Sequence, residues 1–415
     1  MDIQARLDEI DELGLTRRMR LVSGPQGPRV VLDGRPVLLL CSNNYLGLAD
    51  HPRVREAAAD AAMRWGVGAG ASRLVSGTMT IHRRLEDALA AFKQREAAVL
   101  YGSGYLANTG VVSALAGRGE VVFSDELNHA SLIDGCRLAR AETVIYRHND
   151  VEHLAWCMQQ AGDRGSLVVT DSVFSMDGDV APLTQIAELA QRHGVRTVVD
   201  EAHGTGCVGP GGRGAVAEAG LEQEIDVVIG TLGKALGAYG AFVACDAEMA
   251  RFLTNTSRPL IFSTAPPPPA VAGALAALEL LIEQPRMVSK LQANADVMRT
   301  ELAAEGFEVA GSTTQIVPLI VGDAALAMRV CEAAIERGVF AQAIRPPTVP
   351  EGTSRLRLAL MASHTKAELR EAARELGRAA LQAGFRPGAG VPLAAAQERN
   401  PAHPPPAGPF DSVAA

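Results

Sequence analysis

The stretch Thr231-Leu232-Gly233-Lys234-Ala235-Leu236-Gly237-Ala238-Tyr239-Gly240 joins two short apolar runs, at 226–230 and 241–244. Such runs predict buried strands, so Lys234 stands on a glycine-rich turn where a long side chain has no packing role. A lysine in a water-poor pocket has a lowered pKa, because burial disfavours the ammonium, and its neutral amine can form a Schiff base with an aldehyde. An ordinary loop lysine would give the same local pattern, so partners elsewhere in the chain must decide between the two interpretations.

Composition limits the class of protein. The chain has 415 residues, 47% hydrophobic and 21% charged, a length that usually holds two or more domains. A net charge of -8, no basic stripe and few aromatic residues argue against nucleic-acid binding. The first 20 residues lack the apolar core of a signal peptide, and no apolar run is long enough to span a membrane. Six scattered cysteines without a CxxC pair indicate a reduced cytoplasmic protein with neither a disulfide framework nor a metal site.

Short apolar runs alternate with helical patterns through the middle of the chain. We expect strands at 97–101, 121–124, 143–146, 167–171, 197–200 and 226–230, and helices at 130–140, 151–161 and 183–193. This alternation predicts repeated βαβ units and a mainly parallel sheet, which is an α/β fold. Because ligands of such sheets bind beyond the carboxyl ends of the strands, the polar residues that follow each run should converge on one crevice.

The residues at those strand ends form a coherent chemical set. Gly102-Ser103-Gly104-Tyr105 opens a helix after the first strand, and the free N–H groups of a helix start suit a phosphate. Asp200 closes an apolar run, so its desolvated carboxylate needs a cationic partner, which a protonated pyridine nitrogen would supply. His203 would hydrogen-bond a ring oxygen, and His129 would stack on the ring face. Although each residue alone has an ordinary structural explanation, together with Lys234 they fit pyridoxal 5'-phosphate (PLP).

At these residues the chain resembles the α-oxoamine synthases, a family of fold-type I PLP enzymes. The resemblance covers 43–365, and its most specific motifs are Ser72-Arg73-Leu74-Val75-Ser76-Gly77, Val173-Phe174-Ser175-Met176-Asp177-Gly178-Asp179 and Ile344-Arg345-Pro346-Pro347-Thr348-Val349-Pro350. It implies a seven-stranded, mainly parallel sheet in a large domain and a small α+β domain after it. With the sequence patterns, we expect an N-terminal helix and hairpin at 1–45, the large domain at 46–285, the small domain at 286–384 and a disordered tail at 385–415.

The resemblance implies a role for each residue of the cofactor site. Lys234 would be the Schiff-base lysine and general base, Asp200 the partner of the pyridinium nitrogen, and His203 the donor to the ring oxygen. His129 would be the stacking ring, and Ser175 would contact the ring oxygen or the substrate. The phosphate contacts would come from Gly104, Tyr105 and Thr231, and from Ser263 and Thr264 of the neighbouring subunit. Active sites shared in this way imply a homodimer.

A strand expected at 354–360 carries two arginines. Its period-two pattern places Arg355 and Arg357 on one face and the leucines on the other. On the pattern alone this is either a solvated face or a guanidinium fork for a carboxylate. The resemblance implies that Arg357 binds the α-carboxylate of the amino-acid substrate, with Asn44 helping. Further substrate contacts are expected at Arg345 and Thr348, and the contacts of the acyl chain stay open among Arg17, Arg18 and Arg345.

Within this family the resemblance points to the branch of biotin biosynthesis. Its members are acyltransferases that condense L-alanine with a pimeloyl thioester, on CoA or a carrier protein, to 8-amino-7-oxononanoate, CO2 and free thiol. Asn43-Asn44-Tyr45 keeps a glycine C-acetyltransferase open, because many members of the biotin branch carry Asp at the second position and the acetyltransferases commonly carry Asn. A non-catalytic partner subunit is the alternative of another class, and the presence of Lys234, Asp200 and His203 argues against it.

Overall fold

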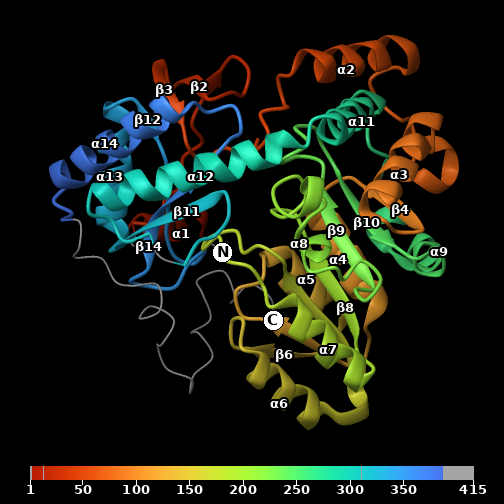
Figure 1. The fold of residues 1–415 in the computed structure, drawn as a ribbon. Coiled ribbons are helices and arrows are strands. Elements are labelled where there is room, and N and C mark those ends of the chain that lie inside the picture. Colours follow the sequence, from red (N-terminus) through yellow and green to blue (C-terminus); the bar gives the residue numbers. More distant parts are fainter. Residues whose placement is uncertain (1, 13, 310, 387–415) are drawn as a thin grey trace.

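A seven-stranded sheet forms the centre of the larger part of the computed structural model, which describes residues 2–12, 14–309 and 311–386 (Figure 1). The strands, in sheet order, are β4 (Ala97–Tyr101), β10 (Ala241–Cys245), β9 (Val227–Thr231), β8 (Arg196–Asp200), β7 (Gly165–Asp171), β5 (Val121–Asp125) and β6 (Glu142–Tyr146). β10 is antiparallel to both of its neighbours, and the other pairs are parallel. The predicted α/β fold is therefore confirmed, and all of the predicted strands are present with their ends shifted by no more than two residues.

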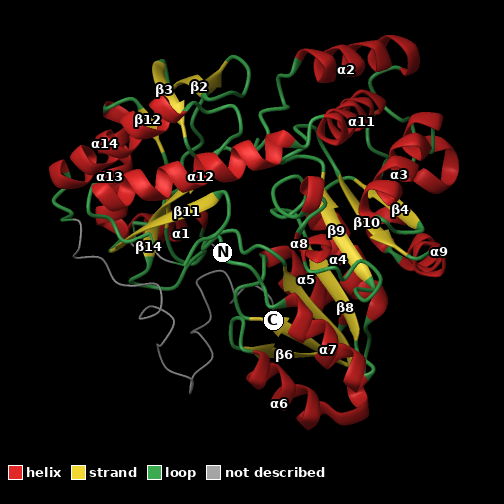
Figure 2. Cartoon of the chain, viewed as in Figure 1, coloured by secondary structure: helices red, strands yellow, loops and turns green. Residues whose placement is uncertain are grey.

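Helices cover both faces of this sheet (Figure 2). One face carries α4 (Gly104–Leu115), α5 (Ala130–Ala139), α9 (Ala247–Thr256) and α10 (Arg258–Ile261). The other carries α3 (Thr80–Lys93), α6 (Val151–Ala161) and α7 (Leu183–His193), with α11 (Pro268–Glu283) on α3 and α2 (Pro52–Trp65) on α11. Side chains alternate between two hydrophobic cores along each strand, as Leu100 and Val99 show. This is why these strands read as continuous apolar runs.

A small antiparallel sheet forms the C-terminal part. It consists of β11 (Ile316–Gly322), β14 (Ser354–Ala359) and β13 (Gln342–Ile344), with α12 (Arg286–Ala304), α13 (Ala324–Glu336) and α14 (Lys366–Gln382) beside it. A capping box of Thr365 and Glu368 starts α14. The small α+β part was predicted correctly. The expected domain boundary at 285–286 falls between α11 and α12, and the division into domains remains a prediction.

The N-terminal region pairs with the C-terminal part. Strands β2 (Arg29–Leu32) and β3 (Arg35–Leu39) form a hairpin whose turn residues, Asp33 and Gly34, have φ of 48° and 83°, as a type I′ turn requires. β1 (Val22–Ser23) and the parallel strand β12 (Val339–Phe340) extend this hairpin to four strands. The expected N-terminal helix is present as α1 (Ile3–Glu12). It ends there because the chain turns at Gly14, where φ is 64°, and the Leu15 N–H bonds back to the Ile10 carbonyl at 2.9 Å.

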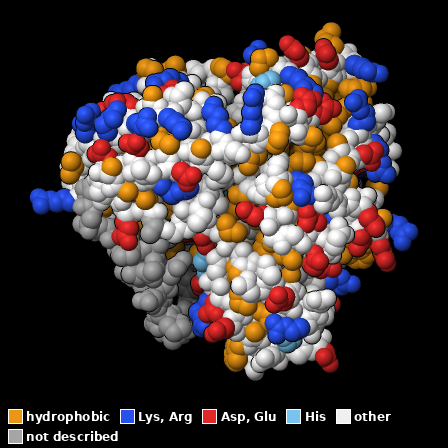
Figure 3. All heavy atoms as spheres, viewed as in Figure 1, with side chains coloured by type: hydrophobic (Ala, Val, Ile, Leu, Met, Phe, Trp, Pro, Cys, Tyr) orange, Lys and Arg blue, Asp and Glu red, His pale blue; other side chains and the backbone are white. Residues whose placement is uncertain are grey.

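The predicted tail lies mostly outside the described residues, which end at Arg386. Its first residue, Phe385, is buried and stacks on Phe307 with ring centroids 6.2 Å apart. No helix in the described ranges has both the length and the apolar character needed to cross a membrane. The face in Figure 3 mixes acidic and basic side chains over both parts of the molecule, so the net charge of -8 is not gathered there in a single acidic patch.

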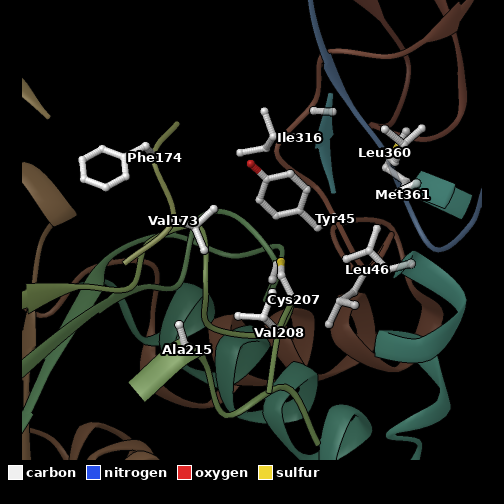
Figure 4. Close-up of a cluster of buried hydrophobic side chains, with 14 of the residues drawn as sticks. Tyr45, Leu46, Val173, Phe174, Cys207, Val208, Ala215, Ile316, Leu360 and Met361 are labelled. Carbon is white, nitrogen blue, oxygen red and sulfur yellow. The ribbon is translucent and has the colours of Figure 1, made fainter. Parts of the chain in front are cut away.

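A buried cluster joins the two parts beside the carboxyl ends of the large sheet's strands (Figure 4). It contains Tyr45 and Leu46 from the segment after β3, Val173 and Phe174 from the loop after β7, Cys207, Val208 and Ala215 from the segment after β8, and Ile316, Leu360 and Met361 from the small part. Tyr45 lies in the middle of this cluster and is fully buried. The cluster therefore brings the loops that follow β3, β7 and β8 against β11 and the end of β14.

Candidate active site

Lys234 lies in the turn that joins β9 to β10. The turn is closed by bonds from the Leu232 N–H to the Gly240 carbonyl, at 2.9 Å, and from the Ala238 N–H to the Leu232 carbonyl, at 2.8 Å. Gly237 has φ of 61°, and a Cβ there would collide with the backbone of Ala49, so the turn requires glycine at this position. This geometry directs the Lys234 amine to the carboxyl ends of the strands, where Nζ lies 2.8 Å from Nε2 of His203.

Burial sets the protonation of both groups. It lowers the pKa of Lys234 to about 8, with Asp200 and Asp171 opposing the shift and Arg357 adding to it. Burial, followed by the charges of Lys234 and Arg357, lowers the pKa of His203 well below its usual 6.5. A neutral His203 can accept a hydrogen bond from Lys234 at Nε2 and donate one from Nδ1 to the Tyr45 hydroxyl, which is 2.7 Å away.

Tyr45 extends this network to Arg357. Its hydroxyl donates to Oδ1 of Asn43 at 3.0 Å and accepts from Nη2 of Arg357 at 3.2 Å. Arg357 also donates from Nη1 to Asn43, at 3.2 Å, and from Nε to the Ser175 carbonyl. The Arg357 guanidinium has five N–H groups, and three of them donate to these described residues. One N–H group on each terminal nitrogen is left, and a carboxylate bound in bidentate fashion requires two such donors. Hydrogen bonds therefore link the expected carboxylate site to the Lys234 amine.

The neighbour of Asn43 faces elsewhere. Asn44 donates from Nδ2 to the Gln26 carbonyl, at 3.4 Å, and accepts from the Ala49 N–H at 3.2 Å. The structure thus places Asn43, and not the predicted Asn44, against Arg357. Neither Asn43 nor Tyr45 was assigned a role from the sequence, although both belong to the stretch Asn43-Asn44-Tyr45 that follows β3.

Asp200 ends β8 and is a buried carboxylate of the site. Its carboxylate accepts from Nδ2 of Asn108 at 2.6 Å and from the Ala202 N–H at 2.7 Å. Asp171 is its register partner on β7, and burial together with the Asp200 charge raises the pKa of Asp171 well above 3.8. Asp171 is therefore protonated more readily than an exposed aspartate. Asn108 was not assigned from the sequence, and the signal for it was a buried amide in the middle of the mainly apolar helix α4.

His129 caps the start of α5 next to these groups. The backbone N–H of His129 donates to Oδ2 of Asp171 at 2.8 Å. Its ring nitrogen Nδ1 lies 2.6 Å from the Ser131 hydroxyl, which also accepts from Asn108. Burial lowers the pKa of His129, while the charge of Asp200 raises it and that of Lys234 lowers it. The imidazole of His129 therefore lies within electrostatic reach of both predicted partners of the cofactor.

The predicted phosphate contacts surround a helix start. α4 begins at Gly104, where an added Cβ would meet no atom within 4 Å, and Ser103 caps it by accepting from the Leu106 N–H at 3.2 Å. Tyr105 is half exposed and donates to the Asp134 carboxylate. Thr231 accepts from the Gly233 N–H at 3.2 Å. An open helix start beside a buried amine and a buried carboxylate fits PLP, since the helix start suits its phosphate and Asp200 its ring nitrogen.

Ser263 and Thr264 lie apart from these groups, in the segment before α11. Thr264 forms an isolated bridge with Ser72, next to the Ser72–Gly77 motif, and the Ala265 N–H bonds to the Ala71 carbonyl at 3.0 Å. Within the described residues, neither hydroxyl makes a hydrogen bond inside the chain. Their predicted contact with a neighbouring subunit's phosphate remains a prediction.

A cavity of about 470 Å³ lies between the N-terminal segment and the small part. Its lining includes Arg17, Arg18, Arg20, Gln342, Arg345 and Thr348. Arg345 donates to the carbonyls of Gly14 and Thr16, which holds the segment after α1 over the cavity. Each of the arginines left open as acyl contacts, and Thr348, therefore lines one basic cavity.

The lowered pKa of Lys234 predicts a pH-dependent stability of the cofactor-free protein. The pKa of Lys234 in the folded protein, about 8, lies below the usual 10.5. The destabilising effect of the buried ammonium is therefore present in full below pH 8. Between these values the unfolded chain binds more protons, and stability rises with pH. Lys234→Met should raise the free energy of unfolding by up to about 3 kcal/mol at pH 7 and by little at pH 10.5. Urea unfolding at both pH values measures this, with Lys290→Met, at an exposed lysine, as the control. An equal change in the free energy of unfolding in both variants would contradict the prediction.

Known proteins place the chain in a family. Residues 35–376 match the family described as Aminotransferase class I and II. The chain is 53% identical over 367 residues to an 8-amino-7-oxononanoate synthase of Anaeromyxobacter dehalogenans strain 2CP-1, covering 88% of this chain and 92% of that one. It is 50% identical over 387 residues to an 8-amino-7-oxononanoate synthase of Geobacter sulfurreducens, covering 92% and 99%. A serine palmitoyltransferase from S. paucimobilis, solved with a bound PLP–myriocin aldimine, superposes with a TM-score of 0.87 at 33% identity, covering 92% and 97%. The chain therefore belongs to the aminotransferase class I and II family, a PLP-dependent family within which it groups with the α-oxoamine synthases.

Proposed function

We propose that this protein is a PLP-dependent acyltransferase that condenses L-alanine with a pimeloyl thioester to 8-amino-7-oxononanoate, CO2 and free thiol in biotin biosynthesis. The observation that carries the proposal is the hydrogen-bonded chain from Arg357 through Tyr45 and His203 to Lys234, with Asp200 at the end of the neighbouring strand. One site therefore contains a guanidinium that can bind a carboxylate, an amine and a buried carboxylate. We also propose that the enzyme works in the cytoplasm as a homodimer.

The side chains of this site divide the work between binding and proton transfer. When bound, PLP supplies an aldehyde that condenses with amines and a protonated ring that accepts an electron pair. Asp200, fixed by Asn108 and the Ala202 N–H, would favour the protonated form of the ring nitrogen. Arg357 offers two N–H groups to the carboxylate of alanine.

Lys234 moves the proton. With a pKa of about 8, part of its amine is neutral at neutral pH, so Nζ can take the Cα proton of alanine as Cα bonds to the thioester carbonyl carbon and the thiolate leaves, to be protonated by water. After CO2 is lost, the Lys234 ammonium returns a proton to Cα. His203, which is neutral and hydrogen-bonded to Nζ, orients the amine for both steps.

The basic cavity supports a donor with a charged acyl end. Pimelate carries a second carboxylate at the far end of its chain, and Arg17, Arg18 and Arg345 are among the residues that line the cavity. An acetyl group has no such end. This argument favours a pimeloyl donor over the acetyl donor of a glycine C-acetyltransferase.

Arg345→Ala should raise the KM for pimeloyl-CoA by about 10- to 100-fold, the cost of one charge-assisted hydrogen bond, and leave the KM for alanine unchanged. Heptanoyl-CoA, which lacks the far carboxylate, should show a KM that Arg345→Ala does not change. Steady-state thiol release with both donors measures this, and Arg337→Ala, at the end of α13 and bonded to Glu375, serves as the control. Equal increases for both donors would mean that Arg345 contacts the CoA moiety instead.

The function itself is tested by substrate choice. Purified protein is incubated with alanine or glycine, each with acetyl-CoA or pimeloyl-CoA, and thiol release is followed. We expect release to be fastest with alanine and pimeloyl-CoA. Faster release with glycine and acetyl-CoA would assign the acetyltransferase activity, and a protein without PLP absorbance near the visible edge would be a non-catalytic partner.

A further inference from the structure

His148 lies between two carboxylates near the carboxyl edge of the seven-stranded sheet. Nδ1 is 2.9 Å from Oδ1 of Asp125, and Nε2 is 2.7 Å from Oδ2 of Asp179. The side chains of His148 and Asp125 are only 5% and 1% exposed. Since both ring nitrogens face carboxylate oxygens, both donate and the ring is an imidazolium. Burial alone would favour the neutral ring, but the hydrogen bonds to Asp125 and Asp179 raise the pKa of His148 to about 10.

This imidazolium fixes the loop that follows β7. Two backbone hydrogen bonds close the loop. The Phe174 N–H donates to the Asp179 carbonyl at 3.0 Å, and the Gly178 N–H donates to the Phe174 carbonyl at 2.9 Å. The Phe174 ring meets His148 edge to face, with centroids 4.3 Å apart. Asn149 adds a bond from Nδ2 to Asp179 at 2.8 Å. One side of the loop is therefore anchored to the end of the large sheet.

The other side of the same loop holds the arginines of β14. Arg357 donates from Nε to the Ser175 carbonyl, and Arg355 pairs with the Asp177 carboxylate. The Gly178 carbonyl accepts from the Thr314 hydroxyl at 2.9 Å. The Ser175 bond determines the direction in which the two remaining N–H groups of Arg357 point, since Nε lies in the plane of the guanidinium fork.

We propose that His148 is a positioning residue for amino-acid binding. By holding Asp179 it sets the loop 174–179, and through the Ser175 carbonyl it orients the Arg357 fork for the substrate carboxylate. His148 touches neither substrate nor reacting atoms, and acts through the loop. The proposal rests on the proposed function, in which Arg357 binds the carboxylate of alanine.

The test is the KM for alanine in His148→Gln, measured on the holoenzyme at saturating pimeloyl-CoA. Glutamine can bond one of the two carboxylates but carries no charge, so the loop loses one anchor. We expect the KM for alanine to rise about 10-fold, with the KM for pimeloyl-CoA changed less than twofold. His193→Gln, which alters an exposed histidine at the end of α7, should leave both values unchanged.

Two further variants separate the possible failures. Arg357→Lys measured in parallel tests the proposed function, because an unchanged KM for alanine would show that Arg357 does not bind the carboxylate. If Arg357→Lys raises that KM while His148→Gln leaves it within twofold of wild type, the positioning role is overturned. Should His148→Gln fail to fold, Asp179→Asn removes one charge at a partly exposed carboxylate and is expected to give the same selective rise. A purely structural role would lower the active fraction or the melting temperature and leave the KM of the active enzyme unchanged.

Discussion

Lys234→Ala is expected to lower kcat with alanine and pimeloyl-CoA by at least about 10⁴-fold, because one amine both anchors the cofactor aldehyde and transfers the Cα proton. The variant should still bind PLP, since the Asp200 carboxylate and the start of α4 are unaltered. Its absorbance should differ from that of wild type, in which the amine is attached to the aldehyde. Thiol release and the absorption spectrum measure the two effects on one sample.

Lys290→Ala is the matched control, because this lysine is exposed on α12 and has no role in the site. It should keep wild-type activity. Borohydride treatment of the wild-type holoenzyme should fix the cofactor on Lys234. A Lys234→Ala enzyme within about 100-fold of wild-type kcat, which is less than removal of an effective general base usually costs, or a cofactor fixed on another lysine, would contradict the assignment.

The fold could be predicted from the sequence because its signals are local. Strands buried on both faces give continuous apolar runs, as at Leu167–Val169, and their spacing by helices indicates a parallel sheet. The residues at the carboxyl ends of those strands were found for the same reason, since position after a run identifies them. Lys234, His203, Asp200 and His129 do lie together in the structure.

The partners of those residues could not be found in this way, because they come from distant segments. Tyr45 contacts His203 across 158 positions, and Asn108 contacts Asp200 across 92. The pairing of β3 with β12 is of the same kind, and a two-residue strand carries no pattern of its own. Local patterns report burial, whereas these contacts depend on how loops pack against one another.

Asp200→Asn should lower kcat by about 10²- to 10⁴-fold at neutral pH. Asparagine keeps the size of the side chain and can still accept from Asn108 or the Ala202 N–H, so the expected loss is mainly that of the charge. Removing one member of a buried ion pair costs about 3–5 kcal/mol, and each 1.36 kcal/mol in the barrier is about tenfold in rate. Steady-state thiol release with saturating substrates measures the effect.

Asp171 makes this prediction sharper. The Asp200 charge is one cause of the raised pKa of Asp171, so in Asp200→Asn that pKa falls and Asp171 can ionise more readily. A carboxyl group gains its charge as pH rises, so the activity of Asp200→Asn relative to wild type should increase with pH, and adding Asp171→Asn should abolish this relative increase. Asp171→Asn alone should cost less than about tenfold, because the raised pKa of Asp171 favours its protonated form, which asparagine resembles. An Asp200→Asn enzyme within tenfold of wild type at every pH would show that the cationic ring does not depend on this carboxylate.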